Sequence, residues 1–422
     1  MTSKPRAVAI VDGEHYPPVV RDALAGLPYD VVCAVLIGGT EKLRGDRDYG
    51  VELLSDVEEA LDRFDPDLVV DLSDEPVLGP VERFGLASNV LARRIPYVGA
   101  DFRFDPPQEA PFPLPSLSVV GTGKRVGKTA VTGYVARLAA TRGRVVVVAM
   151  GRGGPEEPEV VTVPPTVEDL VALSRAGRHA ASDYLETAAL TGVTTVGCRR
   201  CGGGLAGGVY ASNVEAGART ALDLDPDLVV FDGSGAALPP VEADRRLLVV
   251  GGNQSPSVAA GYLNAYRILR ADLIVLTFAE EGTEWESVFE AVRAVARPGV
   301  EVIPAVLRPR PLTEVTGRSV AYFCAAPAAA HAVLARYLEE AHDARVVHVS
   351  GNLADRDALR RELPEVDADV FLVELKAAAV DVVAEHALAR GGEVVLAAND
   401  VVARSLEGGL DRMLLEMARI AR

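Results

Sequence analysis

The sequence is poor in lysine, in cysteine and in long apolar runs. Only five of its 43 basic side chains are lysines, and its 422 residues include just four cysteines. So few cysteines argue against a disulfide scaffold and fit a reducing compartment. The longest apolar runs, such as Val145–Met150, are far shorter than the roughly 20 residues of a membrane-spanning helix. We therefore expect a cytoplasmic protein without a membrane partner.

The chain has fewer basic than acidic side chains, 43 against 60. Its formal net charge is −17, while 49% of its residues are hydrophobic. A negative surface repels the phosphates of nucleic acids, so we expect no nucleic-acid partner. The apolar content is sufficient for large cores, and the length predicts two or three domains at roughly 150 residues each.

Short apolar runs alternate with amphipathic stretches along most of the sequence, which is typical of parallel sheets covered by helices. One segment, Asp105–Pro115, is too rich in proline for a helix or a central strand, so we expect a linker. The predicted domains are 1–105, linker 106–116, 117–340 and 341–422. The last region either folds alone or extends the central sheet.

Four expectations concern local structure. The apolar spacing predicts helices at Val51–Arg63 and Val401–Ile420, and a strand at Val300–Pro304. The glycines of Gly197–Gly208 predict a loop.

A phosphate-loop pattern stands between an apolar strand and an amphipathic helix. Backbone amides at such a helix N-terminus bind anions, and the glycines let phosphate approach closely. The pattern predicts that Lys128 reaches the β- and γ-phosphates of ATP and that the Thr129 hydroxyl binds Mg²⁺. The expected nucleotide-binding residues are Gly121, Thr122, Gly123, Lys124, Arg125, Val126, Gly127, Lys128, Thr129 and Ala130. The fold class is therefore α/β, with a parallel-sheet P-loop NTPase domain, an N-terminal Rossmann-like domain and a C-terminal βα extension.

The expected partner of the phosphate loop is Asp232, which ends the apolar run Leu228–Asp232. A carboxylate there can reach the Mg²⁺ shell, although a capping aspartate has the same pattern. Lys124 faces nucleotide or substrate, or is a solvated loop residue. Arg152 lies in a glycine loop after the next strand, where it either binds an anion or belongs to a surface turn. We expect Lys124, Lys128, Arg152 and Asp232 to be the catalytic residues.

Further basic residues follow other predicted strands. Arg199 and Arg200 lie between Cys198 and Cys201, whose spacing is that of half a zinc site. The glycine loop that carries the two arginines either covers an anionic ligand or is a flexible, solvated hairpin. A cationic cluster with the residues above would bind a small, multiply charged anion. The remaining candidates for this cluster are Arg308, Arg310 and Lys376. Lys376 either binds the anion or forms a salt bridge with a nearby carboxylate. Asp12, Glu14 and His15 follow the first strand and either line a site or form a glycine turn.

Five segments together resemble the cyclic 2,3-diphosphoglycerate synthetase family. They are Asp12–Pro18, Gly121–Thr129, Gly151–Pro155, Asp232–Ala236 and Glu374–Asp381. The resemblance implies a cytoplasmic homodimer that uses ATP and Mg²⁺ to close 2,3-diphosphoglycerate through an intramolecular phosphoanhydride, releasing ADP and phosphate. Asp12, Glu14, His15, Arg152, Arg199, Arg200, Arg308, Arg310 and Lys376 would then bind the substrate, and Thr129 and Asp232 the metal.

Two alternatives remain open at this point. One is another ATP-dependent enzyme, such as a 2-phosphoglycerate kinase or a ligase for a different small acid, since arginines recognise phosphate without identifying the rest of a molecule. The other is a nucleotide-switched binding protein. The partition ATPases of that kind carry a lysine near the start of the loop, where this chain has Gly123.

Overall fold

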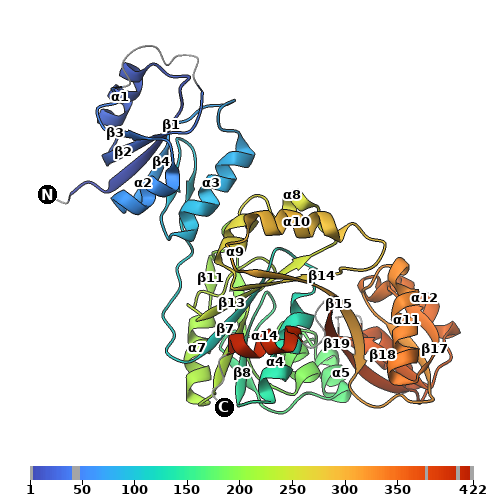
Figure 1. Ribbon diagram of the computed structural model, residues 1–422. Coiled ribbons are helices and arrows are strands. Elements are labelled where there is room, and N and C mark those ends of the chain that lie inside the picture. Colours follow the sequence, from blue (N-terminus) through green and yellow to red (C-terminus); the bar gives the residue numbers. More distant parts are fainter. Residues whose placement is uncertain (1–2, 40–47, 376–378, 405–408, 419–422) are drawn as a thin grey trace. The chain divides into compact units, whose positions relative to one another are not determined.

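The computed structural model describes residues 3–39, 48–375, 379–404 and 409–418. Two compact units divide the chain, and each has its own sheet covered by helices (Figure 1). The first unit comprises Met1–Pro107, Gln254–Arg270 and Glu290–Gly299, and the second comprises Gln108–Asn253, Ala271–Phe289 and Val300–Arg422. The predicted α/β class is confirmed.

The first unit contains a six-stranded sheet. Its elements are β1 (Arg6–Val11), β2 (Asp30–Leu36), β3 (Glu52–Leu54), β4 (Leu68–Asp71), β5 (Tyr97–Val98), β6 (Arg103–Phe104), α1 (Pro17–Gly26), α2 (Val57–Phe64), α3 (Pro80–Ala92), α8 (Pro256–Ala259) and α9 (Asn264–Arg270). The strand order is β3-β2-β1-β4-β5-β6, parallel except for the β5–β6 pair. The direction of strand addition reverses between β1 and β4, so this is a doubly wound arrangement.

The helix predicted over Val51–Arg63 is wrong in its first half. Residues Glu52–Leu54 form β3, which pairs with β2, and the helix begins only at Val57. Asp56 ends the extended segment because its side chain accepts a hydrogen bond from the backbone amide of Glu59 and caps α2. A three-residue edge strand has no periodicity of its own, so the helical spacing downstream concealed it.

The second unit contains a sheet of 13 described strands. The strands are β7 (Ser116–Gly121), β8 (Val145–Gly151), β9 (Glu159–Val161), β10 (Thr194–Cys201), β11 (Ala211–Ser212), β12 (Leu228–Asp232), β13 (Arg245–Gly251), β14 (Leu273–Thr277), β15 (Glu301–Pro311), β16 (Ser319–Phe323), β17 (Arg345–Ser350), β18 (Val370–Glu374) and β19 (Glu393–Ala403). Their order is β11-β10-β8-β12-β7-β13-β14-β15-β19-β18-β16-β17, and β9 pairs with β10. Parallel pairing from β10 to β15 brings the carboxyl ends of these strands to one edge.

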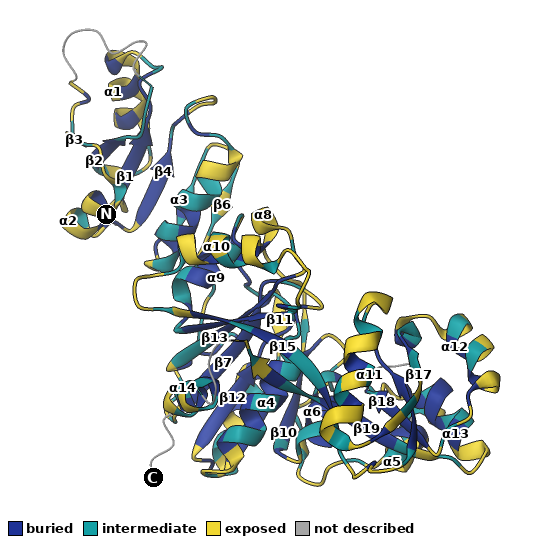
Figure 2. Cartoon of the chain, turned by 45° about the vertical axis from the view of Figure 1, so that its right-hand side comes forward, coloured by how far each residue is buried: buried dark blue, intermediate teal, exposed yellow. Residues whose placement is uncertain are grey.

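Helices cover both faces of this sheet (Figure 1). They are α4 (Lys128–Ala140), α5 (Val167–Arg175), α6 (Asp183–Thr191), α7 (Val214–Asp223), α10 (Trp285–Val295, of which Trp285–Phe289 belong to this unit), α11 (Ala328–His342), α12 (Arg356–Glu362), α13 (Glu385–Ala389) and α14 (Gly409–Ala418). Two 3-10 helices, η1 (Asn352–Ala354) and η2 (Leu363–Glu365), and the π-helix η3 (Ala379–Ala384) complete the unit. One core packs α4 and α14 on the central strands, and another packs α7 on their opposite face. The central strands are therefore buried on both sides (Figure 2), which explains their nearly continuous apolar sequences.

The C-terminal strands join the P-loop strands through the antiparallel pair β15–β19. This pair corrects two expectations. The strand predicted to end at Pro304 continues to Pro311, and Val401–Ala403 belong to β19 rather than to a helix; α14 begins at Gly409. Each strand supplies the hydrogen-bonding partner that the other needs, and a pairing across about 100 residues leaves no local signal in the sequence.

Among the helices of the described residues, none is both long and apolar enough to cross a bilayer.

Candidate active site

The phosphate loop connects the buried strand β7 to the N-terminus of α4. Its shape depends on two glycines with little room around them. A Cβ at Gly121 would lie 2.8 Å from Val126 Cγ2, and Gly127 has φ +77° with its Cβ position 2.9 Å from Leu307 Cδ1. A larger residue at either place would displace the loop, so the backbone amides at the start of α4 are held at the sheet edge.

Lys128 and Asp232 form a buried ion pair at this edge. Lys128 Nζ lies 2.5 Å from Asp232 Oδ1, which also accepts a hydrogen bond of 2.5 Å from Thr132 Oγ1. The side chains are 10% and 1% exposed. Burial raises the pKa of Asp232, and the charge of Lys128 opposes that shift. The structure thus places Asp232 at the end of β12 beside the phosphate loop, as its sequence context predicts.

Two basic side chains contact the turn that follows Asp232, and a third acts on one of them through its charge. Arg200 donates to the carbonyl oxygen of Ser234 (3.0 Å) and to its hydroxyl (3.2 Å). Lys124 lies over the same turn, with its Cγ 3.8 Å from a Cβ position on Gly235. Burial lowers the pKa of Arg200 and the positive charge of Arg152 lowers it further, so these guanidinium groups repel each other. An anion between them would relieve this repulsion.

We call Lys124, Arg152 and Arg200 the open basic group. None of the three forms an ion pair with any residue that the structure describes. Lys124 and Arg152 are exposed, and Arg200 is half-buried. Positive charge without a carboxylate partner beside a phosphate loop is the arrangement that a polyanionic ligand requires.

Asp183 was missed by the sequence interpretation. It is the first residue of α6, and its Oδ2 lies 3.1 Å from a Cβ position on Gly151, at the end of β8. Its negative charge acts on Asp232, whose pKa it raises, and on Arg200. Asp183 is a second carboxylate at this edge, and an aspartate in a first helical turn looks like ordinary helix stabilisation in a sequence.

The other arginines of the predicted cluster are neutralised locally, and their surroundings differ from the expected loops. Arg308 lies within β15 and binds Glu280 through both terminal nitrogens, at 2.7 and 3.0 Å. Arg310, also within β15, lies 3.4 Å from Asp400. Arg199 lies on β10 rather than in a loop, is exposed, and is 3.9 Å from Glu156.

The glycine loop predicted over Gly197–Gly208 is partly strand. β10 continues to Cys201, so Cys198 and Cys201 project from opposite sides, one buried and the other exposed. Burial raises the pKa of the Cys198 thiol to about 12. The two sulfurs do not form half of a zinc site in this arrangement, because ligands to one ion must converge.

In the first unit, Asp12 organises the carboxyl end of β1. Its fully buried carboxylate accepts hydrogen bonds from the backbone amides of Glu14 (2.9 Å) and Asp74 (2.6 Å) and contacts His15 Nδ1 at 2.8 Å. Burial alone would raise the pKa of Asp12, but these hydrogen bonds outweigh it and lower the pKa. Substrate binding by Asp12, Glu14 and His15 stays a prediction. Lys376 lies outside the described residues.

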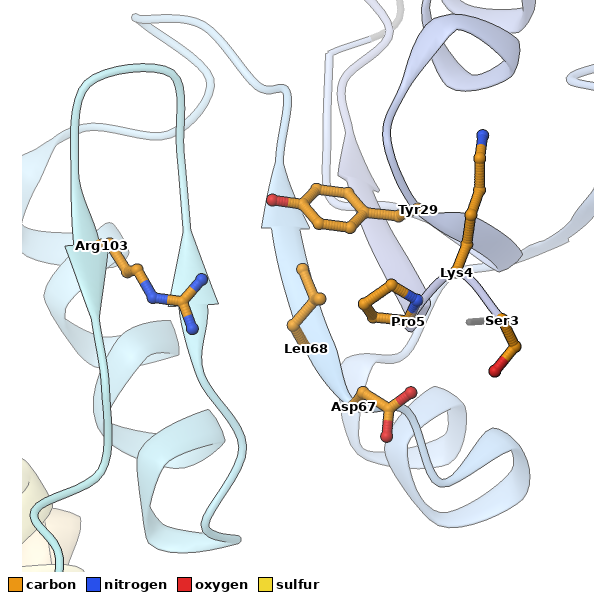
Figure 3. A pocket seen from close by; sticks show the side chains of 7 residues that line it. All are labelled: Ser3, Lys4, Pro5, Tyr29, Asp67, Leu68 and Arg103. Carbon is orange, nitrogen blue, oxygen red and sulfur yellow. The ribbon is translucent and has the colours of Figure 1, made fainter. Parts of the chain in front are cut away.

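A hollow of about 410 Å³ opens at the amino ends of the first unit's strands (Figure 3). It is lined by Ser3, Lys4, Pro5, Tyr29, Asp67, Leu68 and Arg103. Its charged groups have local partners: Lys4 donates to the Leu27 carbonyl, and Arg103 pairs with Asp105. Ligands of parallel sheets bind at the opposite, carboxyl edge, so we assign no role to this hollow.

The phosphate loop, the buried aspartate and the open basic group define a nucleotide-binding P-loop enzyme. Family models for cyclic 2,3-diphosphoglycerate synthetase match the chain in three consecutive parts: the N-terminal domain at residues 6–105, the P-loop domain at 116–306 and the C-terminal domain at 311–400. The chain therefore belongs to the cyclic 2,3-diphosphoglycerate synthetase family, and the resemblance seen in its motifs is confirmed.

Curated relatives agree with this assignment. Proteins named cyclic 2,3-diphosphoglycerate synthetase are 52% identical in Rubrobacter xylanophilus (99% of this chain, 98% of the relative), 43% in Methanothermobacter thermautotrophicus (96% and 94%) and 40% in Methanothermus fervidus (99% and 97%). Among solved structures, the signal recognition particle receptor FtsY from Elizabethkingia anophelis matches 53% of this chain and 64% of its own, at 16% identity and a TM-score of 0.26.

Proposed function

We propose that this enzyme uses ATP to close 2,3-diphosphoglycerate into cyclic 2,3-diphosphoglycerate, with release of ADP and inorganic phosphate. The relatives named above support the product, and the phosphate loop supports the nucleotide. The observation that carries the proposal is the open basic group beside Lys128. The substrate has two phosphates and a carboxylate, and its two phosphates must approach each other against strong repulsion. Positive charges at a partly dehydrated site reduce that repulsion.

The reaction has two steps in this proposal. The γ-phosphoryl group of ATP passes to one substrate phosphate, so that ADP leaves and a pyrophosphoryl group forms. The second substrate phosphate then attacks the inner phosphorus of that group, and inorganic phosphate departs as the ring closes. Neither step needs a protein nucleophile, because the protein's task is to position the reactants and stabilise charge.

Lys128 and the open basic group have separate tasks. Lys128 exchanges its contact with Asp232 for the β- and γ-phosphates and stabilises the charge of the first transfer. Arg152 and Arg200 hold the two substrate phosphates near each other for the second. Lys124, on the phosphate loop itself, contacts either the nucleotide or the substrate in this scheme.

The residues at this edge fit Mg²⁺. Thr129, Asp232 and Asp183 offer hydroxyl and carboxylate oxygens, which Mg²⁺ prefers, and a bound Mg²⁺ would neutralise charge on the nucleotide phosphates. The described residues contain no group of three or more His, Cys, Asp or Glu side chains that could hold a metal. This agrees with Mg²⁺ held by one or two carboxylates together with water and phosphate oxygens.

The wider organisation is also part of the proposal. We propose a cytoplasmic homodimer, with an N-terminal domain over 1–105, a linker over 106–116, the ATP-binding domain over 117–340 and a C-terminal region over 341–422. Sedimentation equilibrium of the purified protein tests the dimer.

Phosphorus NMR tests the reaction. The protein is incubated with ATP, Mg²⁺ and either 2,3-diphosphoglycerate or 2-phosphoglycerate. We expect the signals of a cyclic phosphoanhydride, ADP and phosphate with the first acid and no product with the second. A linear diphosphoglycerate formed from 2-phosphoglycerate would instead show a kinase. Positional isotope exchange in ATP tests the two-step order, because a reversible first transfer scrambles the bridging oxygen.

A further inference from the structure

The chain's single tryptophan, Trp285, is the first residue of α10 and directly follows the loop that connects β14 to this helix. Thr277, the last residue of β14, donates its hydroxyl to the carbonyl oxygen of Val126 at 2.7 Å, and its own carbonyl accepts from the Gly252 amide at 2.8 Å. A Cβ on Gly252 would lie 2.9 Å from Trp285 Cβ. Trp285 therefore lies beside Gly252, which is hydrogen-bonded to the same Thr277 that contacts the phosphate loop, and all of these residues belong to one compact unit.

Strain and side-chain contacts fix this loop. Phe278 adopts a positive φ of 56°, which is a genuine outlier for a bulky residue and is found mainly at functional sites. Arg404 donates to the Ala279 carbonyl at 2.7 Å and places its guanidinium carbon 5.7 Å from the Trp285 ring centre. Phe289 contacts the indole edge-on, with ring centres 6.0 Å apart. The half-buried indole thus has a defined position.

The charge of the loop decides which part of a ligand can lie there. The loop carries three glutamates, Glu280, Glu281 and Glu284, and Glu286 follows in the first turn of α10. Arg308 neutralises Glu280, while Glu281, Glu284 and Glu286 are exposed. Phosphates are repelled from such a surface, whereas an uncharged heterocycle with amino groups is not.

The order of the strands indicates the direction in which a bound nucleotide extends from the phosphate loop. Asp232 ends β12, Arg152 directly follows β8, and Arg200 lies near the end of β10, and all three strands are on one side of β7. A phosphorylated substrate at the open basic group occupies that side. The part of a nucleotide beyond its phosphates must then extend to the other side, where β13 and β14 end at Gly251 and Thr277.

We infer that Trp285 binds the purine base of the nucleotide by stacking, with Arg404 and the strained Phe278 backbone holding the indole in position. This inference rests on the proposed function, because it takes the bound nucleotide to be ATP or ADP. Trp285 is a specificity-determining residue in this scheme and takes no part in phosphoryl transfer.

Intrinsic fluorescence tests the inference in the unmodified protein, since all tryptophan emission comes from Trp285. The protein is titrated with ADP and, separately, with inorganic tripolyphosphate, which occupies the phosphate loop but has no base. We expect ADP to quench the emission and tripolyphosphate to leave it unchanged, with binding of both measured by calorimetry. Equal responses to the two ligands, or binding of ADP without any change in emission, would overturn the inference.

Variants give the second measurement. Trp285→Ala should raise the Kd for ADP roughly tenfold, and Trp285→Phe much less, while the Kd for tripolyphosphate stays constant. Tyr337→Ala, which removes a half-buried aromatic ring from α11, is the matched control and should leave both constants unchanged. Wild-type affinity for ADP in Trp285→Ala would refute the base site and leave the proposed function standing. Failure of the wild-type protein to bind any adenine nucleotide would refute the proposed function itself.

Discussion

Two sets of arginines on one sheet have opposite surroundings. In the open basic group, Arg152 and Arg200 lie near each other without an ion-pair partner among the described residues. On β15, Arg308 is bound by Glu280, and Arg310 shares Asp400 with Arg137 of α4. All of these are basic residues near strand ends in the sequence, but only the first set has charge to offer a ligand. The location of carboxylates, rather than the number of arginines, therefore identifies the anion site.

The largest effect should come from removing a member of the open basic group. We expect Arg200→Gln to lower kcat/KM for 2,3-diphosphoglycerate about 100-fold, since it removes a charge that opposes repulsion between the substrate phosphates. The measurement is steady-state kinetics together with thermal unfolding. Arg199→Gln, one position earlier on β10, is the control and should change the rate less than threefold. Equal losses of kcat/KM in both variants would contradict the assignment of Arg200, rather than Arg199, to the anion site.

On β15 the expected effect is on stability. Arg308→Gln leaves the Glu280 carboxylate partly buried without its partner, so the free energy of unfolding should fall by about 1–3 kcal/mol. Urea denaturation measures this, and Arg308→Gln combined with Glu280→Gln should recover most of the loss. A large fall in catalytic rate with unchanged stability would place Arg308 in the substrate site instead.

A smaller effect on stability is expected when the carboxylate shared by Arg137 and Arg310 is removed. Asp400→Asn removes the carboxylate between Arg137 and Arg310; burial lowers the pKa of Arg137, and the Arg310 charge lowers it further. We expect a loss of about 1 kcal/mol and a Tm that rises with added phosphate more steeply than in the wild type, because the two guanidinium groups then gain from a bound anion. An identical phosphate dependence in both proteins would contradict the electrostatic argument.

The smallest effect concerns cysteine labelling. Cys198 and Cys201 lie on either side of Arg199 and Arg200, and only Cys201 is exposed. Burial raises the pKa of Cys33 to about 11 and those of Cys198 and Cys324 to about 12, so their reactive thiolate forms are scarce at pH 8. Mass spectrometry after brief iodoacetamide treatment should find one modified cysteine, Cys201, with 2,3-diphosphoglycerate slowing the reaction a few-fold. Rapid modification of Cys198 would show that β10 opens at this point.

The sequence predicts the elements whose signals are local. Strand β12 begins and ends with the apolar run Leu228–Asp232 named in the sequence analysis, since it is a short apolar run between turn signals. The phosphate loop and Asp232 follow from the same local context. Asp183, by contrast, reaches the site only because α6 is folded against β8, and the neutralisation of Arg308 depends on a carboxylate 28 residues away. These properties arise from tertiary pairing, which leaves no mark in a single sequence.

The position of β19 has a consequence for synthesis on the ribosome. This strand is the last to be translated among those described, yet it lies between β15 and β18 within the largest sheet. Until it emerges, the nascent chain exposes two unpaired strand edges beside a finished phosphate loop, and such edges can pair with other chains. Emergence of β19 thus completes the sheet, and a truncation before Glu393 should yield an aggregating polypeptide rather than a smaller enzyme.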